Sequence, residues 1–129
     1  MVVDASVIVA ALVDSGPDGE WAADTLRGHA LAAPHHMPIE AANVLRRAVL
    51  AGDLSPDSAS LAHADLLALR VELFPYAPLA DRCWQLRDNV TTYDAAYIAL
   101  AEQLDAPLAT LDARLARSSG PRCEFATPA

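Results

Sequence analysis

The chain has 129 residues, of which 53% are hydrophobic and 20% are charged, so it is neither disordered nor of low complexity, and one packed domain over 1–129 is expected. Its nine basic residues are all Arg and stand against 17 acidic residues, and the net charge of -8 argues against a protein that holds nucleic acid by a broad basic surface. The apolar start has no basic leader region, and no other stretch approaches the roughly 20 apolar residues of a membrane span, so a cytoplasmic location without membrane contact is expected.

The hydrophobic pattern predicts short strands and helices in alternation along the chain. In chain order we expect a strand at 2–3, helices at 5–13 and 20–26, a strand at 29–33, helices at 39–50 and 56–73, a strand at 74–77, helices at 79–86 and 93–104, a strand at 107–111, a helix at 113–117 and a strand at 122–126. Such alternation needs crossover connections between parallel strands. The predicted fold class is therefore α/β, with a parallel sheet covered by helices on both faces.

Local signals predict several helix boundaries. Residues 16–19, Gly-Pro-Asp-Gly, are expected to break the chain before the second helix. Pro38 suits the first turn of the third helix, Ser55 is a cap before a first-turn proline, and Thr92 is the expected cap of the sixth helix. These boundaries determine which acidic residues lie at helix starts.

Four acidic residues lie where predicted strands end or helices begin. Asp4 and Asp112 end strands, whereas Glu40 and Asp94 open helices. In parallel sheets ligands bind beyond the carboxyl ends of the strands, so these four side chains are expected to meet there. Crowded anions destabilise a fold unless a hard cation with oxygen ligands relieves their repulsion. The expected cofactor is therefore Mg²⁺ or Mn²⁺, and the chemistry that suits such a site is phosphodiester hydrolysis by one or two metals.

Each acid also has a purely structural explanation to weigh. Glu40 and Asp94 suit the positive end of a helix dipole, and Asp112 suits a turn or a helix cap. Asp4 is different because it interrupts an apolar strand-to-helix run, where a carboxylate is costly. Function is the better explanation for Asp4.

Four motifs in this order cover essentially the whole chain. They are Asp4-Ala5-Ser6, Glu40-Ala41-Ala42-Asn43-Val44-Leu45-Arg46-Arg47, the run from Thr92 to Ala101 around Asp94, and Thr110-Leu111-Asp112-Ala113-Arg114-Leu115. Together they resemble PIN-domain ribonucleases, specifically VapC-type toxins of bacterial toxin–antitoxin pairs. The resemblance implies a PIN-like three-layer α/β/α fold with about five parallel strands. It also implies a magnesium- or manganese-dependent endoribonuclease that forms a homodimer and is inhibited by a cognate VapB-like antitoxin with a basic tail.

The resemblance also implies roles for individual residues. The catalytic and metal-binding quartet would be Asp4, Glu40, Asp94 and Asp112. Supporting residues would be Ser6, Asn43 and Thr110. The expected contacts to RNA or antitoxin are Arg46 and Arg114, since the Arg fork suits phosphate and carboxylate groups.

Other enzyme classes fit the chain less well. A response-regulator receiver needs an acidic pair after its first strand and a lysine, and a haloacid dehalogenase phosphatase needs Asp-x-Asp, whereas Asp4 stands alone and the chain has no lysine. The alternative that stays open is a catalytically silent PIN-like module that only binds or regulates.

Residues outside the motifs are expected to have structural roles. The pair His35-His36 is expected in a solvated loop, and Trp84 in the core or an interface. Cys83 and Cys123 are expected to be buried free thiols, with a disulfide as the minor alternative.

Overall fold

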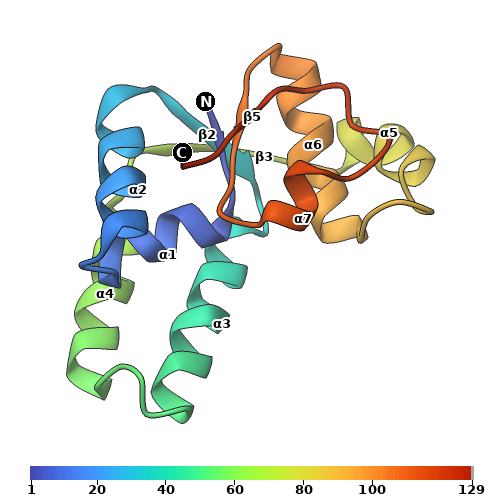
Figure 1. The fold of residues 1–129 in the computed structure, drawn as a ribbon. Coiled ribbons are helices and arrows are strands. Elements are labelled where there is room, and N and C mark those ends of the chain that lie inside the picture. The colour runs from blue at the N-terminus through green and yellow to red at the C-terminus, as the bar shows by residue number, and fades with distance from the viewer. Residues whose placement is uncertain (129) are drawn as a thin grey trace.

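The computed structural model describes residues 1–128 and has one sheet with helices on both faces (Figure 1). All strand pairs are parallel, in the order β3-β2-β1-β4-β5. The strands are β1 (Val2–Val3), β2 (Leu31–Pro34), β3 (Val71–Phe74), β4 (Leu108–Ala109) and β5 (Phe125–Ala126). The five-stranded parallel sheet confirms the predicted fold class. Ala129, the last residue of the expected domain, lies outside the described residues.

Helices form the two outer layers. They are α1 (Ala5–Val13), α2 (Pro17–Gly28), α3 (Met37–Leu50), α4 (Pro56–Ala68), α5 (Ala80–Gln85), α6 (Thr92–Leu104) and α7 (Ala113–Ala116), with a short 3₁₀ helix η1 (Ala77–Leu79) before α5. Helix α6 packs on β1, β2 and β4, while α1 and α2 pack together on the other side of the sheet (Figure 1). Among residues 1–128, no helix is long and apolar enough to cross a bilayer.

The core includes buried residues of α1, and another large part of it lies between the sheet and α6. Val2 and Val3 of β1 are fully buried, as are Leu108 and Ala109 of β4, because β1 is central and both faces of these strands are covered. Helix α6 is buried over the unbroken run 95–101, in which four alanines allow close contact with the strands. This packing places the start of α6 beside the ends of β1 and β4.

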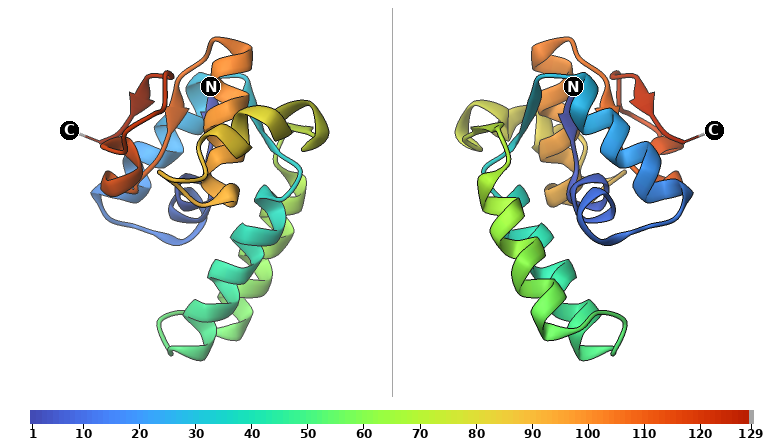
Figure 2. Two further views of the ribbon diagram at one scale, coloured as in Figure 1. Left: turned by 90° about the vertical axis from the view of Figure 1, so that its right-hand side faces the viewer. Right: turned by 90° about the vertical axis from the view of Figure 1, so that its left-hand side faces the viewer.

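Helices α3 and α4 form a hairpin that projects away from the sheet (Figure 2). Their connection turns at Gly52, whose φ of 80° favours glycine. The hairpin carries large exposed side chains, among them Ile39, Leu50, Leu61 and Leu67. The base of α3, by contrast, lies against α1 and supplies part of the pocket described below.

The predicted break at residues 16–19 is wrong, because α2 begins at Pro17. Gly16 is the N-cap, and Pro17 is the first helical residue, where a fixed φ and a missing N–H suit the helix. Gly19 is buried against the backbone of Asp14, so it lets α2 pack tightly on the end of α1. Glycine here serves a close approach of two helices rather than a turn.

The predicted boundary between the fourth helix and the third strand is also wrong. Helix α4 ends at Ala68, and β3 is Val71–Phe74 rather than 74–77. Leu73 has helical spacing from Leu66 and Leu69, but it belongs to this edge strand and is partly exposed. A short leucine-rich run satisfies both periodicities, and pairing with β2 decides between them.

Two smaller predictions about side chains have different outcomes. Trp84 is exposed with the guanidinium of Arg87 over its ring, so it does not belong to the core. Cys83 and Cys123 are both free thiols, as predicted, and Cys83 is buried.

Candidate active site

A pocket of about 560 Å³ opens at the edge of the sheet where β1 and β4 end. Its walls come from α1, α3, the first turns of α6 and the residue before α7. The acids that line it are Asp4, Asp14, Glu40, Asp94 and Asp112. The structure therefore brings the four sequence-predicted acids together, and it adds Asp14 at the end of α1.

Asp4 is the most buried of these acids, with 7% of its surface exposed. The hydroxyl of Ser6 donates to its Oδ1 at 2.5 Å, and the hydroxyl of Thr110 donates to its Oδ2 at 2.5 Å. The N–H of Val7 also donates to Oδ1, at 3.2 Å, so Asp4 is the N-cap of α1. Burial raises the pKa of Asp4 above its ordinary value, and these hydrogen bonds offset only part of that rise.

The two hydroxyls also fix the loop that follows β4. Ser6 Oγ accepts from the N–H of Leu111 at 3.1 Å, and Thr110 Oγ1 accepts from the N–H of Asp112 at 3.0 Å. Each hydroxyl therefore donates to Asp4 and accepts from the backbone beside Asp112. The predicted supporting residues Ser6 and Thr110 thus connect two acids that are distant in the sequence.

Asp94 lies in the first turn of α6, which is capped by Thr91 rather than by the predicted Thr92. Burial raises the pKa of Asp94, a hydrogen bond with Thr91 opposes this rise, and the negative charges of Glu40, Asp112 and Asp4 raise the pKa further. The four carboxylates are therefore close enough to repel one another.

Glu40 is held by two side chains for which the sequence analysis predicted no functional role. Its Oε1 accepts from the hydroxyl of Tyr97 at 2.8 Å and lies 2.9 Å from Nε2 of His36. Burial raises the pKa of Glu40, but the hydrogen bonds from His36 and Tyr97 and the charge of His36 outweigh it, so the pKa is lowered. Burial and the neighbouring Glu40 raise the pKa of Tyr97 far above its ordinary value.

Weak signals for these two residues were present in the sequence. His36 precedes Glu40 by four residues, a spacing that brings side chains together on a helix, and Tyr97 follows Asp94 by one turn. The prediction of a solvated loop overlooked the first spacing. The apolar stripe of the sixth helix explained Tyr97 as core, and its ring is indeed buried.

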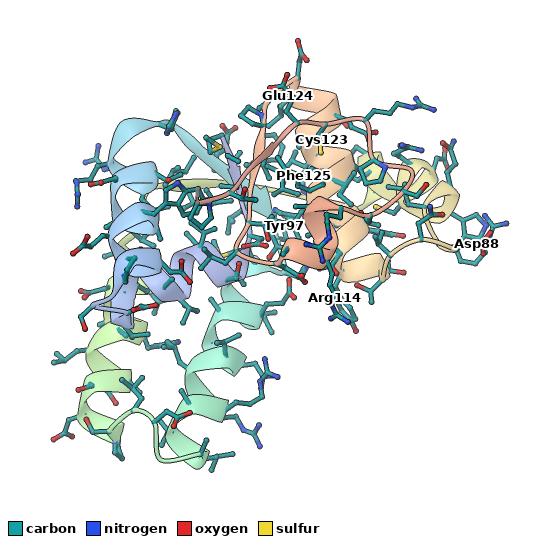
Figure 3. The ribbon with its side chains drawn as sticks, viewed as in Figure 1. Asp88, Tyr97, Arg114, Cys123, Glu124 and Phe125 are labelled. Carbon is teal, nitrogen blue, oxygen red and sulfur yellow. The ribbon has the colours of Figure 1, made fainter. Side chains whose placement is uncertain are left out.

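The arginines predicted as contacts do not line the pocket. Arg46 lines a separate groove between α3 and α4, and Arg114 is exposed on α7, whose N-cap is Asp112. Arg47 is instead the one basic side chain among the described residues that line the pocket, and the predicted supporting residue Asn43 lines it one turn away. Figure 3 shows Arg114 on α7 and Tyr97 on α6.

The chemistry of the pocket fits a hard divalent cation. Carboxylate oxygens are the ligands that Mg²⁺ and Mn²⁺ prefer, and a cation would relieve the repulsion that raises the pKa of Asp94. Within residues 1–128, no three His, Cys, Asp or Glu side chains converge tightly enough to form a coordination shell by themselves. Mg²⁺ typically binds one or two carboxylates and keeps several waters, so a loose acidic pocket suits it better than a closed cage.

Comparisons with known proteins identify the family. The PIN domain model matches residues 1–120. Ribonuclease VapC1 of Mycobacterium tuberculosis is 43% identical over 125 residues, which cover 96% of this chain and 94% of the relative. Ribonuclease VapC12 of the same organism is 38% identical over 97% of this chain and 96% of the relative. The crystal structure of VapBC2 from Rickettsia felis, bound to a DNA fragment from their promoter, has the same fold, with a TM-score of 0.68 at 12% identity over 98% of this chain and 96% of that chain.

Proposed function

This chain belongs to the PIN domain family, among relatives of the VapC type, and on that premise we propose that it is a divalent-metal-dependent endoribonuclease, the toxin of a type II toxin–antitoxin pair. One observation carries the proposal. Carboxylates from positions 4, 40, 94 and 112 line a single pocket at the carboxyl edge of the sheet. The name of the relatives, ribonuclease, supports RNA as the substrate.

The residues of the pocket have different roles in the proposed hydrolysis of a phosphodiester. A divalent cation bound there would lower the pKa of a coordinated water and offset charge on the phosphate. Asp4 presents a carboxylate held at both oxygens, so its orientation is fixed before substrate binds. The pKa of Asp94 is raised by burial and by the other carboxylates, so a nearby positive charge would favour its ionised form. Glu40, with its lowered pKa, is ionised at neutral pH and can accept a hydrogen bond from the attacking water.

Arg47 is the side chain best placed to contact the RNA backbone. It is exposed, it lines the acidic pocket, and it forms no ion pair with the described acids. A guanidinium at this position can bind a phosphate that flanks the scissile one. Its role would be substrate binding rather than chemistry.

A protein partner, the antitoxin, is the second part of the proposal. The structure of VapBC2 supports a protein partner, and the net charge of -8 suits a basic segment from that partner. Arg46 in the groove between α3 and α4, and Arg114 on α7, remain proposed contacts to RNA or to this antitoxin. A homodimer remains part of the proposal.

The test is RNA cleavage with Mg²⁺ or Mn²⁺ by the wild type and by Asp4→Asn, which keeps the cap of α1. We expect Asp4→Asn to lose on the order of 10²–10⁴-fold in rate, as for loss of a catalytic group. Removal of the metal with a chelator should abolish cleavage by the wild type, and Mn²⁺ should restore it.

The matched control is Asp88→Asn, because Asp88 is exposed and lies far from the pocket (Figure 3). It should cleave like the wild type. Equal cleavage by Asp4→Asn would defeat the metal mechanism. A wild type that binds RNA and cleaves none would favour the catalytically silent module.

A second comparison tests the substrate contact. Arg47→Gln should raise KM for RNA about three- to tenfold with little change in kcat, since an exposed charged hydrogen bond to the substrate is lost. Arg70→Gln, an exposed arginine outside the pocket with no proposed contact, is the control and should leave both constants unchanged. Equal effects of the two variants would remove Arg47 from the substrate site.

A further inference from the structure

We propose that His36 and Tyr97 are positioning residues, which hold one carboxylate oxygen of Glu40 and so turn its other oxygen toward the cation and substrate. This inference rests on the proposed function, because it concerns the same pocket. His36 and Tyr97 lie outside the acidic quartet, and this inference gives both side chains a role in the site.

Tyr97 supplies the first contact. Its ring is buried in α6, with 1% of the residue exposed, and its hydroxyl donates to Glu40 Oε1 at 2.8 Å. A buried phenol needs a partner for its O–H, and this carboxylate is the partner that the structure gives it. The donor therefore comes from a rigid part of the core, which makes it a fixed point for the Glu40 side chain.

His36 supplies the second contact, and the geometry determines where its hydrogen lies. Nε2 is 2.9 Å from Glu40 Oε1 and 3.2 Å from the carbonyl oxygen of Tyr93. Both neighbours are acceptors, so Nε2 must carry a hydrogen whatever the state of Nδ1. The ring lies edge-on to Tyr93 and Tyr97, at centroid distances of 5.9 and 5.2 Å, which restricts its rotation.

Both donors reach the same oxygen, which has a consequence for the other one. Glu40 Oε1 is shared by His36 and Tyr97, whereas Oε2 has no hydrogen-bond partner among residues 1–128, and Glu40 lines the pocket. A free Glu side chain samples many rotamers, but one held at Oε1 presents Oε2 in few orientations. Asp4 is arranged differently, since protein donors reach both of its oxygens.

The contact also joins two walls of the pocket. His36 is the residue before α3, and Tyr97 is one turn into α6, 57 residues from Glu40. The distance between these helices therefore sets the position of the Glu40 carboxylate. Second-layer partners of this kind commonly change metal affinity by about 10–100-fold when removed.

The experiment measures Mn²⁺ affinity directly, by the electron paramagnetic resonance signal of free Mn²⁺. We expect Tyr97→Phe, which removes only the hydroxyl, to weaken Mn²⁺ binding about tenfold. Tyr76→Phe, an exposed tyrosine outside the pocket, is the matched control and should bind like the wild type. In a Glu40→Gln background, Tyr97→Phe should add no further loss, because its effect acts through Glu40.

Substitution of His36 gives a second test, which does not depend on whether the Tyr97→Phe variant folds. His36→Ala should weaken Mn²⁺ binding, and His36→Gln, which keeps an N–H donor, should restore part of it. Affinities like the wild type in both His36→Ala and Tyr97→Phe, or equal losses in the Glu40→Gln background, would overturn the inference. A wild type that binds no Mn²⁺ and cleaves no RNA would overturn the proposed function and this inference with it, whereas unaltered variants of a Mn²⁺-binding wild type overturn only the inference.

Discussion

Asp94 is a residue that the fold tolerates at a cost. Burial and the charges of Glu40, Asp112 and Asp4 raise its pKa, so without a cation the ionised form destabilises the folded chain. Active sites commonly carry such destabilising groups, because the function needs charges that the fold alone would exclude. Removing the charge should therefore stabilise the protein and impair the proposed activity.

The sign of the pH dependence follows from the raised pKa. Between the ordinary pKa of Asp and the raised one, the folded chain holds a proton that the unfolded chain releases, so stability falls as pH rises through this window. At pH 7 in a chelator, Asp94→Asn should therefore melt about 2 to 4 °C above the wild type. The difference should shrink as pH falls through the raised pKa and vanish below the ordinary one.

Thermal unfolding from pH 3 to 8 checks this expectation, with Asp88→Asn as the control outside the pocket. A melting temperature for Asp94→Asn at or below that of the wild type at pH 7 would show that Asp94 is not repelled by its neighbours. Adding Mg²⁺ should stabilise the wild type more than the variant, since a cation that binds only the folded state raises its stability.

Single residues also show what sequence could reveal of the site. Asp4 was identifiable because a carboxylate inside an apolar run is costly, although the structure shows that it also caps α1. The other three acids were predicted from their places at a strand end and at helix starts, and the motif resemblance supported them. The contact of His36 with Glu40 was signalled only by their spacing of four residues. The contact of Tyr97 with Glu40 could not be predicted, since it joins residues 57 positions apart and depends on how α3 and α6 are placed. Hydrophobic periodicity explains why Tyr97 is buried, but it does not predict which partner the hydroxyl of Tyr97 contacts.

At the scale of elements, the close contact between α1 and α2 depends on Gly19. A Cβ there would lie 1.8 Å from the carbonyl oxygen of Asp14, which is backbone and cannot move without shifting the helices. Gly28, at the end of the same helix, has nothing within 4 Å of its Cβ position. Alanine would therefore clash at Gly19 and fit at Gly28, so the second glycine is a matched control for substitution of the first.

We expect Gly19→Ala to lower the free energy of unfolding by about 2 kcal/mol or more, as overpacking does, and to displace Asp14 at the pocket. Gly28→Ala should raise it by about 0.4–1 kcal/mol, because alanine restricts the unfolded chain and fits the helix. Urea unfolding measures both. Similar values for the two variants would contradict the close approach of α2 to Asp14.

Helices and strands were predicted correctly where the hydrophobic pattern fits only one kind of element. Helix α1 and the strand before it were placed correctly because a nine-residue apolar run is too long for a strand of this sheet. The start of α2 and the end of α4 were misplaced, since Gly-Pro can open a helix as well as break a chain, and leucines at 66, 69 and 73 fit a helix as well as a helix followed by a strand. Tertiary pairing resolves such ambiguity.

At the scale of the whole molecule, charge opposes the proposed substrate. The net charge of -8 repels RNA at long range, and Arg47 is the single basic side chain that the described residues contribute to the pocket. The parallel sheet was predictable because alternating strands and helices allow few other topologies. The projection of the α3–α4 hairpin was not, since periodicity predicts helices and not the direction in which they leave the sheet (Figure 2).

RNA binding should therefore depend only weakly on salt. For a non-cleavable RNA analogue in Mg²⁺, the slope of log K against log[NaCl] should be no steeper than about -1, since each phosphate contact to a single strand contributes about -0.7 and screening of the repulsion acts in the opposite direction. Fluorescence anisotropy between low and physiological salt measures this slope. A slope of about -4 would mean several phosphate contacts and a basic surface elsewhere on the molecule.

The position of Asp4 has a practical consequence for anyone who needs an inert version of this protein, for crystallising complexes or raising antibodies. Because the same side chain begins α1 and anchors the hydroxyls of Ser6 and Thr110, truncation to alanine would remove three acceptor contacts at once and cost about 1–2 kcal/mol for the cap alone. Asparagine keeps an oxygen for the helix start while discarding the charge. The protein can thus be made inactive with its fold preserved, provided that Asp4 is replaced by asparagine and not by alanine.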